Sequence, residues 1–279
     1  MGRPDGKRVR DAEPNYQVMC YVLKERNDAQ NMVTVHIPVD PMSRYIREKK
    51  KEGVTVSHLA LVIAAYLRCC AEFRHLNDFV MNGRMYRRHE FTCGMVVLKP
   101  GDSDGTMNKM RMDFTDGIFE VQAKLDAYIA QNRATGETNS TDKLVRELLA
   151  VPGLVRFAVW LFRHLDKHNL LPKKVIDASP FHVSLCISNL ASIRTNHIYH
   201  HCYNFGTTSV FITMGNLVEV PRRGLMGAVT TERCLPLGVV MDERIASGSY
   251  FATAFQHMKA YLADPRLLEG PPTFELFSK

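Results

Sequence analysis

The stretch Pro236–Gly248, which reads PLGVVMDERIASG, decides the fold. Residues Leu235–Val240 are apolar and rich in valine, which is typical of a buried strand. The charged tripeptide Asp242–Arg244 follows almost at once, and apolar residues return at helical spacing over Tyr250–Leu262. This stretch therefore predicts a buried strand, a charged turn and a closing helix.

Outward from this stretch, helices and strands are mixed and joined by long connections. A strand is expected at Met32–Val39 and an apolar helix at Val56–Phe73, and Asn82-Gly83 is a strong hairpin signal. There is no internal repeat and no convincing linker. We expect one α/β or α+β domain over residues 1–279, with residues 1–30 forming an N-terminal surface segment.

Three separated segments carry a family resemblance. They are KEGVT at Lys51–Thr55 with EFRHLN at Glu72–Asn77, then ISNL at Ile187–Leu190, and finally Pro236–Gly248. In this order they resemble the catalytic domain of the dihydrolipoamide acyltransferases of 2-oxo-acid dehydrogenase complexes. Chloramphenicol acetyltransferase is similar in fold. The resemblance covers most of the chain from about position 30 to 270.

The resemblance implies a fold, an assembly and a substrate. The fold is the CoA-dependent acyltransferase fold, a two-layer α/β sandwich with a mixed sheet. The assembly is a homotrimer with active sites in channels at subunit interfaces, and the substrate is CoA or acyl-CoA. No lipoyl or subunit-binding domain precedes the matched segments, so a role in a dehydrogenase core is not expected.

One departure from the family pattern bears on catalysis. In the family, the signature histidine removes a proton from the acceptor thiol or hydroxyl. Here Glu243 stands at that position and Ser247 at the signature aspartate, while Asp242, Arg244 and Gly248 match. A solvated glutamate, with a pKa near 4.3, is a weaker base than a histidine near 6.5, although burial in an apolar channel raises a carboxyl pKa. Three interpretations stay open: a replacement base, a site that has lost the chemistry, or a charged turn closed by a salt bridge.

Ser188 is the candidate for the second catalytic role. The family places a hydroxyl there that donates to the tetrahedral oxyanion, and one such donor contributes about 3 kcal/mol. Because the register is uncertain, Ser184 and Asn189 remain alternates, and a strand-end serine that bonds its own backbone is the structural alternative. We expect Asn189, Arg244 and Gly248 to contact CoA.

The segment YHHCYNFG at Tyr199–Gly206 is a further polar and aromatic cluster. Adjacent histidines on a strand point to opposite faces, so His200 and His201 cannot chelate one metal there. One of them can instead supply the missing imidazole to the active channel, or both pack at an interface. His164 and His168 have the i, i+4 spacing of a helical metal site but are expected to be a surface pair. No metal is expected.

Composition narrows the partners. The net charge of +7 and the pI near 9.0 suit anionic partners such as CoA phosphates. No zinc finger or aromatic nucleic-acid-binding pattern is present, so nucleic acid is not expected. Seven cysteines without CxxC spacing, and an N-terminus without an apolar signal region, favour a reducing cytoplasm.

The apolar stretch Leu148–Leu165 has two interpretations. It is a buried helix with Arg156 and Arg163 on one exposed face, or an interfacial helix that contacts a membrane surface or walls a lipophilic acceptor site. It falls short of the roughly 20 apolar residues that cross a bilayer.

The sequence thus predicts acyl transfer from acyl-CoA to a small or lipophilic hydroxyl, amine or thiol acceptor. The alternative is a catalytically inactive homologue that binds CoA or a hydrophobic ligand and acts as a scaffold or sensor.

Overall fold

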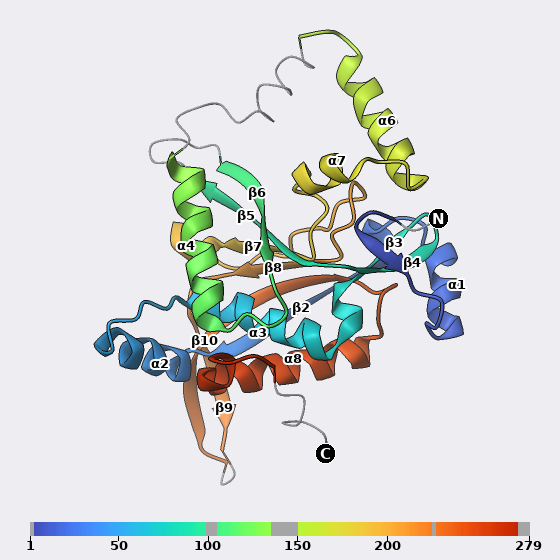
Figure 1. The fold of residues 1–279 in the computed structure, drawn as a ribbon. Coiled ribbons are helices and arrows are strands. Elements are labelled where there is room, and N and C mark those ends of the chain that lie inside the picture. The colour runs from blue at the N-terminus through green and yellow to red at the C-terminus, as the bar shows by residue number, and fades with distance from the viewer. Residues whose placement is uncertain (1–2, 99–104, 135–149, 225–226, 273–279) are drawn as a thin grey trace.

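The computed structural model describes residues 3–98, 105–134, 150–224 and 227–272. Within this part of the chain, the main sheet has seven strands in the order β2–β10–β8–β7–β5–β6, and β9 pairs with β10 (Figure 1). The strands are β2 (Gln30–Pro38), β5 (Phe91–Leu98), β6 (Gly105–Met112), β7 (Leu185–Asn189), β8 (Val210–Met214), β9 (Val218–Arg223) and β10 (Val229–Asp242).

The sheet is mixed. Strand β7 runs parallel to both β5 and β8, and the other pairs are antiparallel. Strand β10 joins the β2 edge to the centre, since it pairs with β2, β8 and β9. The predicted mixed sheet of an α/β fold is confirmed.

One face of the sheet carries the helical layer and the main core (Figure 1). Helices α3 and α8 lie side by side beneath the sheet, and α2 and α4 flank them. The helices of this layer are α2 (Val39–Lys51), α3 (His58–Glu72), α4 (Ile118–Ala134) and α8 (Gly248–Ala263). The described chain also contains 3₁₀ turns at Asn27–Ala29, Arg74–Asn77, Leu190–Ile193 and Pro265–Leu268.

Helix α3 is the centre of this core. The Ser57 hydroxyl caps its N-terminus by accepting a hydrogen bond from the Ala60 amide at 3.1 Å. Every residue from Leu59 to Cys70 is buried. A helix that is apolar on all sides buries its whole surface, which explains its place between the sheet and the neighbouring helices.

A second, three-stranded sheet contains the predicted hairpin. Its order is β1 (Gly6–Arg8), β4 (Arg84–Arg88), β3 (Asp78–Met81). Asn82 and Gly83 join β3 to β4 with φ angles of 51° and 67°. Positive φ at both central residues is the geometry of a two-residue turn that Asn-Gly favours.

The N-terminal segment reaches the core at a few points. It contains β1 and α1 (Pro14–Val22), and it buries Arg3, Cys20 and Arg26. All seven cysteines of the chain are buried and free. They behave as small apolar side chains, as expected for thiols in apolar surroundings.

The opposite face of the sheet is covered by an irregular segment, residues 194–209. Cys202 of this segment packs in a small apolar cluster with four residues of the sheet side: Val183, Cys186, Phe211 and Val240. The segment passes so close to β10 that a Cβ atom at Gly238 would lie 2.4 Å from the Ile198 carbonyl oxygen. Glycine in the middle of a strand marks this close approach of a second backbone.

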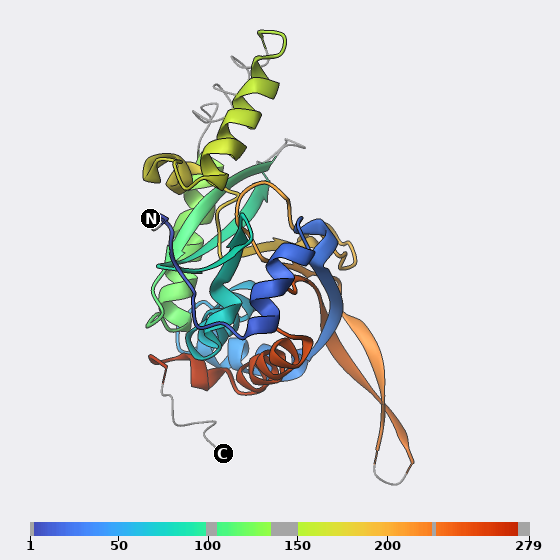
Figure 2. The ribbon, with the colours of Figure 1, turned by 90° about the vertical axis from the view of Figure 1, so that its right-hand side faces the viewer.

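Of the apolar stretch 148–165, residues 148 and 149 lie outside the described residues, and the rest contains a projecting helix instead of a buried one. Helix α6 (Leu154–Lys167) extends away from the body, at the end remote from the β9–β10 hairpin (Figure 2). Asp166 is its one buried residue, whereas Phe157 and Trp160 are 56% and 57% exposed. The buried-helix interpretation is therefore wrong. The short helix α7 (Lys173–Ala178) follows, and no helix among the described residues is long and apolar enough to cross a membrane.

Candidate active site

The charged turn after β10 is closed by an internal ion pair. Asp242 is fully buried and accepts two hydrogen bonds from the Arg244 guanidinium, at 2.8 Å from Nε and 2.7 Å from Nη2. The Arg244 amide also donates to Asp242 Oδ1 at 3.2 Å. A bidentate pair of this kind fixes the backbone of the turn and hence the direction of the residue between its members.

A second arginine supports the same carboxylate. Arg26 Nε lies 3.4 Å from Asp242 Oδ2, and the Arg26 guanidinium donates to backbone carbonyls of Val80, Tyr203 and Gly206. Burial lowers the pKa of Arg26, while the charge of Asp242 acts in the opposite direction. Burial also disfavours the charged form of Arg244, but its hydrogen bonds to Asp242 and the attraction of that negative charge together outweigh burial and raise the pKa of Arg244.

Glu243 is held on this rigid turn by two contacts. Its amide donates to the Ala29 carbonyl at 2.8 Å, and its Oε2 accepts a hydrogen bond from Asn31 Nδ2 at 2.8 Å. The side chain is half-buried and forms no ion pair with a described residue. The predicted salt bridge of the turn is therefore present, but it joins Asp242 to Arg244 and leaves the Glu243 carboxylate directed elsewhere.

Ser188 lies on the face of the sheet that the helices do not cover. Its neighbour Ile187 points into the helical core, so Ser188 points the opposite way. The strand register aligns it with Thr213, then Gly238, then Thr34 across β8, β10 and β2. These four positions form one row across the face opposite the helical layer, beneath the irregular segment 194–209. We call this the open face, because no helix covers it.

The two alternates for Ser188 differ in their surroundings. Ser184 is engaged in the backbone ladder, because its Oγ accepts from the Thr92 amide at 3.0 Å and donates to the Glu90 carbonyl at 3.4 Å. Asn189 Oδ1 is buried and has no hydrogen-bond partner among the described residues. Asn189 therefore keeps a free acceptor at the strand end, and Ser184 does not.

Ser188 and Glu243 are not brought together within one chain. Two strand spacings and four residues along β10 separate Ser188 from Asp242. With strands about 4.8 Å apart and a rise of about 3.3 Å per residue, the separation is about 16 Å. A single substrate carbonyl cannot contact both side chains of one protomer.

The two neighbouring histidines are not on a strand, which corrects the prediction. His200 and His201 lie in the irregular segment over the open face. The His200 ring stacks on Phe211 with centroids 4.1 Å apart, and its Nδ1 lies 3.0 Å from the His201 carbonyl oxygen. The rings of His200 and His201 stack on each other with centroids 4.9 Å apart. The two side chains therefore do not point to opposite faces as neighbours on a strand do.

Sequence reasoning missed His197, which lies over the polar row. Its Nε2 is 2.9 Å from Thr34 Oγ1, and the same hydroxyl is 2.6 Å from the Tyr199 hydroxyl. Its Nδ1 is buried and has no partner among the described residues. Gly238 is the sequence signal for this close approach, because the absence of a Cβ atom makes room for the segment that carries His197.

The remaining matched positions have structural contacts. Arg244 Nη1 donates to the Leu23 and Lys24 carbonyls in addition to its bonds with Asp242. Ser247, at the position of the family's second aspartate, caps α8 by accepting from the Tyr250 amide at 3.1 Å. Gly248 opens α8, and a Cβ there would meet nothing within 4 Å.

Several solved structures of acyltransferases share this arrangement of strands and helices. A probable dihydrolipoamide acetyltransferase from Listeria monocytogenes matches with a TM-score of 0.57 at 13% identity, over 91% of each chain. The Azotobacter vinelandii dihydrolipoamide acetyltransferase matches at 0.58 and 13%, over 91% of this chain and 88% of that one. A chloramphenicol acetyltransferase matches at 0.57 and 10%, over 92% and 99%. The chain has the chloramphenicol acetyltransferase fold.

This fold was predicted from the three sequence segments, and the structural matches confirm it. No family profile matches the sequence, and no curated protein matches it. At 10–13% identity the likeness establishes the arrangement of the backbone and nothing about the reaction.

Proposed function

We propose that the protein transfers an acyl group from acyl-CoA to a small or lipophilic acceptor that carries a hydroxyl, amine or thiol. The observation that carries this proposal is the turn after β10. Its Asp242–Arg244 pair is satisfied internally and presents a carboxylate, Glu243, with no cation opposite it among the described residues. A carboxylate fixed in this way is free to accept a proton.

In the proposed reaction, Glu243 accepts the proton of the acceptor hydroxyl while the hydroxyl oxygen bonds to the thioester carbonyl carbon. Ser188 donates a hydrogen bond to the resulting oxyanion. Collapse of the tetrahedral intermediate breaks the carbon–sulfur bond, and the proton leaves with the CoA thiol. Asn189, at the end of the same strand, offers its unpartnered oxygen to the bound CoA chain.

The separation of about 16 Å between Ser188 and the β10 end leads us to place each active site between two protomers of a homotrimer. One protomer supplies Glu243, and its neighbour supplies Ser188 from the open face of its sheet. His200, His201 and the irregular segment would then line the contact between protomers.

The base is tested by measuring thiol release from a panel of acyl-CoAs with and without candidate acceptors. Glu243→Gln keeps a group that can accept the Asn31 hydrogen bond but removes the base, so turnover should fall about 10²–10⁴-fold. Glu219→Gln, an exposed glutamate on β9, is the matched control and should keep full turnover. Equal turnover in Glu243→Gln and the wild type would remove Glu243 from the mechanism.

The shared site is tested by mixing two inactive variants. Ser188→Ala should lower turnover about 10²-fold or more on its own. Co-expression of Ser188→Ala with Glu243→Gln should restore part of the activity, because some interfaces then combine an intact Ser188 with an intact Glu243. If the mixture stays as inactive as its components, both residues act within one protomer or not at all.

The alternative function is a catalytically inactive protein that binds CoA or a hydrophobic ligand as a scaffold or sensor. It is favoured by the same turn, since Glu243 replaces the expected imidazole. A rise in the melting temperature with CoA, without thiol release from any acyl-CoA, would support it, because a ligand that binds the folded state stabilises that state.

A further inference from the structure

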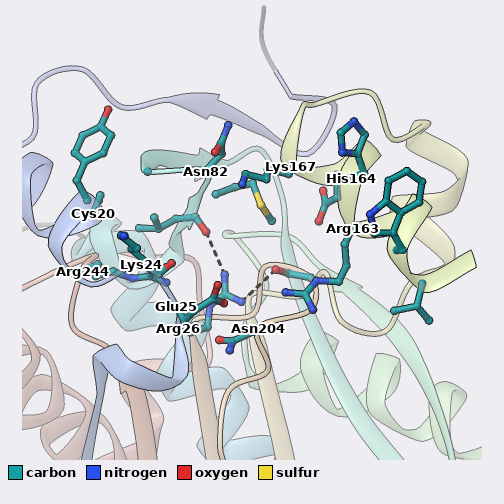
Figure 3. A pocket seen from close by; sticks show the side chains of 18 of the residues that line it. Cys20, Lys24, Glu25, Arg26, Asn82, Arg163, His164, Lys167, Asn204 and Arg244 are labelled. Atoms are coloured by element: carbon teal, nitrogen blue, oxygen red, sulfur yellow. Dashed lines mark hydrogen bonds between the residues drawn. The ribbon is translucent and has the colours of Figure 1, made fainter. Parts of the chain in front are cut away.

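A pocket of about 740 Å³ lies between α6, the end of α1, the β3–β4 turn and the end of the irregular segment 194–209 (Figure 3). Arg26, Gly206 and Arg244 are among the residues that line it. The volume is in the range of small-molecule sites, roughly 300–1,000 Å³. The pocket shares Arg26 and Arg244 with the turn that presents Glu243, but the proposed acyl transfer places no substrate in it.

The pocket has an excess of positive charge. Lys24, Arg156, Arg163 and Lys167 line it, and none of them forms an ion pair with a described residue. Figure 3 shows Arg163 extending from α6 into the pocket, towards the side occupied by Arg26. Several like charges that face one cavity repel one another, and a bound anion relieves that repulsion.

The acidic groups of the pocket do not offset this excess. Asp166 is paired with Arg3 at 2.6 Å and hydrogen-bonded to His182 at 3.0 Å. Glu25 acts on Arg244, whose charge is already shared with Asp242. At least four cations therefore remain for an external anion.

Two aromatic side chains stand at the walls of the same pocket. Trp160, on α6, stacks on His164 with centroids 5.5 Å apart, and Tyr21, on α1, packs on Gly83. Both rings are more than half exposed. Exposed aromatic faces next to arginines suit a planar ring, which stacks while its charged part meets the cations.

Helix α6, which carries most of these basic and aromatic side chains, is fixed to the body of the protein near its C-terminal end. Asp166 joins the end of α6 to Arg3 and His182, and Phe162 stacks on Phe205 at 4.8 Å. These contacts hold the basic face of α6 towards the pocket, so the cationic side chains are already positioned in the free protein. Gathering them in advance lowers the cost of binding.

We propose that this pocket binds a phosphorylated ligand of nucleotide size, with its phosphates between Arg163 and Lys24 and its ring against Trp160. A soluble nucleotide and a lipid headgroup share the phosphate chemistry, and the experiment separates them. The proposal does not depend on acyl transfer, because Glu243→Gln should bind the same ligand as the wild type.

Trp160 is the only tryptophan of the chain, so its fluorescence reports on this pocket alone. ADP titrated into the protein at low salt should change the Trp160 emission saturably, and added salt should weaken binding because the cations are exposed. Inorganic pyrophosphate should compete with ADP. Trp160→Phe should abolish the signal, with binding then followed by equilibrium dialysis.

The matched variants remove the same charge at two places. Arg156→Gln/Arg163→Gln should weaken ADP binding about tenfold or more, because the phosphates lose a charged hydrogen bond from Arg163 and the nearby positive charge of Arg156. Arg223→Gln/Arg233→Gln, on the exposed β9–β10 hairpin, should change it less than about twofold, since salt screens charges far from the site. Equal weakening by both pairs would show attraction by net charge alone and overturn the proposal.

Vesicles distinguish the second source of phosphate. Binding to phosphatidylglycerol but not phosphatidylcholine vesicles, lost in Arg156→Gln/Arg163→Gln, identifies a lipid headgroup and supports the peripheral membrane contact predicted for residues 148–165. Saturable ADP binding without vesicle binding identifies a soluble ligand. Failure of ADP, pyrophosphate and both vesicle types to bind would overturn the proposal.

Discussion

Helices α3 and α6 are both rich in apolar residues, but α3 is buried and α6 is mostly exposed. Every residue of α3 from Leu59 to Cys70 is buried, while Asp166 is the one buried residue of α6. The most buried contact of α6 is thus an ion pair, and its aromatic residues Phe157 and Trp160 are exposed.

The difference lies in how charge is distributed around each helix. Within the buried part of α3, the single charged residue is Arg68, which reaches the carbonyls of Leu267 and Gly270. In α6, Arg156, Arg163 and Lys167 recur at helical spacing and share one face. Apolar content alone does not decide burial, because a basic face keeps a helix at the surface however apolar its other sides are.

The largest expected effect tests the buried helix. Leu61 of α3 is fully buried, and Leu61→Ala should lower the free energy of unfolding by about 3–5 kcal/mol through lost burial and a new cavity. Urea denaturation followed by circular dichroism measures this loss. A loss below 1 kcal/mol would mean that α3 is not the core element that its burial indicates.

The anchor of α6 comes next. Asp166→Asn removes one of the two carboxylates paired with buried Arg3 and leaves Asp5, at 2.8 Å, as the remaining partner, so the loss of stability should be about 1.5–3 kcal/mol. Hydrogen exchange of the α6 amides should accelerate even under conditions in which the globally unfolded state is not populated. Asp177→Asn, in a surface pair with Lys173, is the control and should cost less than about 1 kcal/mol.

The same anchor predicts a pH dependence. Burial lowers the pKa of His182 despite the opposing charge of Asp166, so the folded protein keeps a neutral imidazole. Its Nε2–H donates to Asp166, and its Nδ1 accepts from the Ser179 hydroxyl. Below about pH 6.5 the unfolded chain binds a proton that folded His182 does not. The free energy of unfolding should then fall with decreasing pH, by at most about 1.4 kcal/mol per pH unit.

His182→Asn measures this contribution by difference. Subtracting its unfolding free energies, recorded from pH 8 to pH 5, from those of the wild type isolates the proton that His182 takes up on unfolding. His89→Asn, at an exposed position, should leave the slope unchanged. If wild type and His182→Asn lose stability in parallel, His182 is not the group responsible.

Much of the fold could be predicted because its signals are local. The Asn82-Gly83 turn needs positive φ at both residues, and the dipeptide Asn-Gly is a strong sequence signal for such a turn. The apolar run that ends at Asp242 is buried on both faces in β10, so it is apolar without alternation. Helix α6 was ambiguous because its apolar and basic residues fit either a buried or a surface helix.

The candidate site could be predicted only in part, because it depends on register and on close packing across the sheet. The sequence indicated Glu243 and Ser188 as candidates, but only the strand pairing shows that Ser188 lies about 16 Å from Asp242, the residue before Glu243. His197 was missed because its place over Gly238 is set by an irregular segment with no periodic pattern. A glycine inside an apolar strand was the one local signal.

The smallest expected effect is also the most informative about assembly. Leu161→Ala on α6 repeats the substitution of Leu61→Ala at a position that is 37% exposed in the single chain. Less apolar area is buried there than at Leu61, so the free energy of unfolding should fall by about 1 kcal/mol, well short of the loss in Leu61→Ala. The measurement should be repeated at two protein concentrations. A loss near that of Leu61→Ala, growing with concentration, would mean that a second copy covers this face of α6, and the contrast between the two helices would then hold only for the isolated protomer.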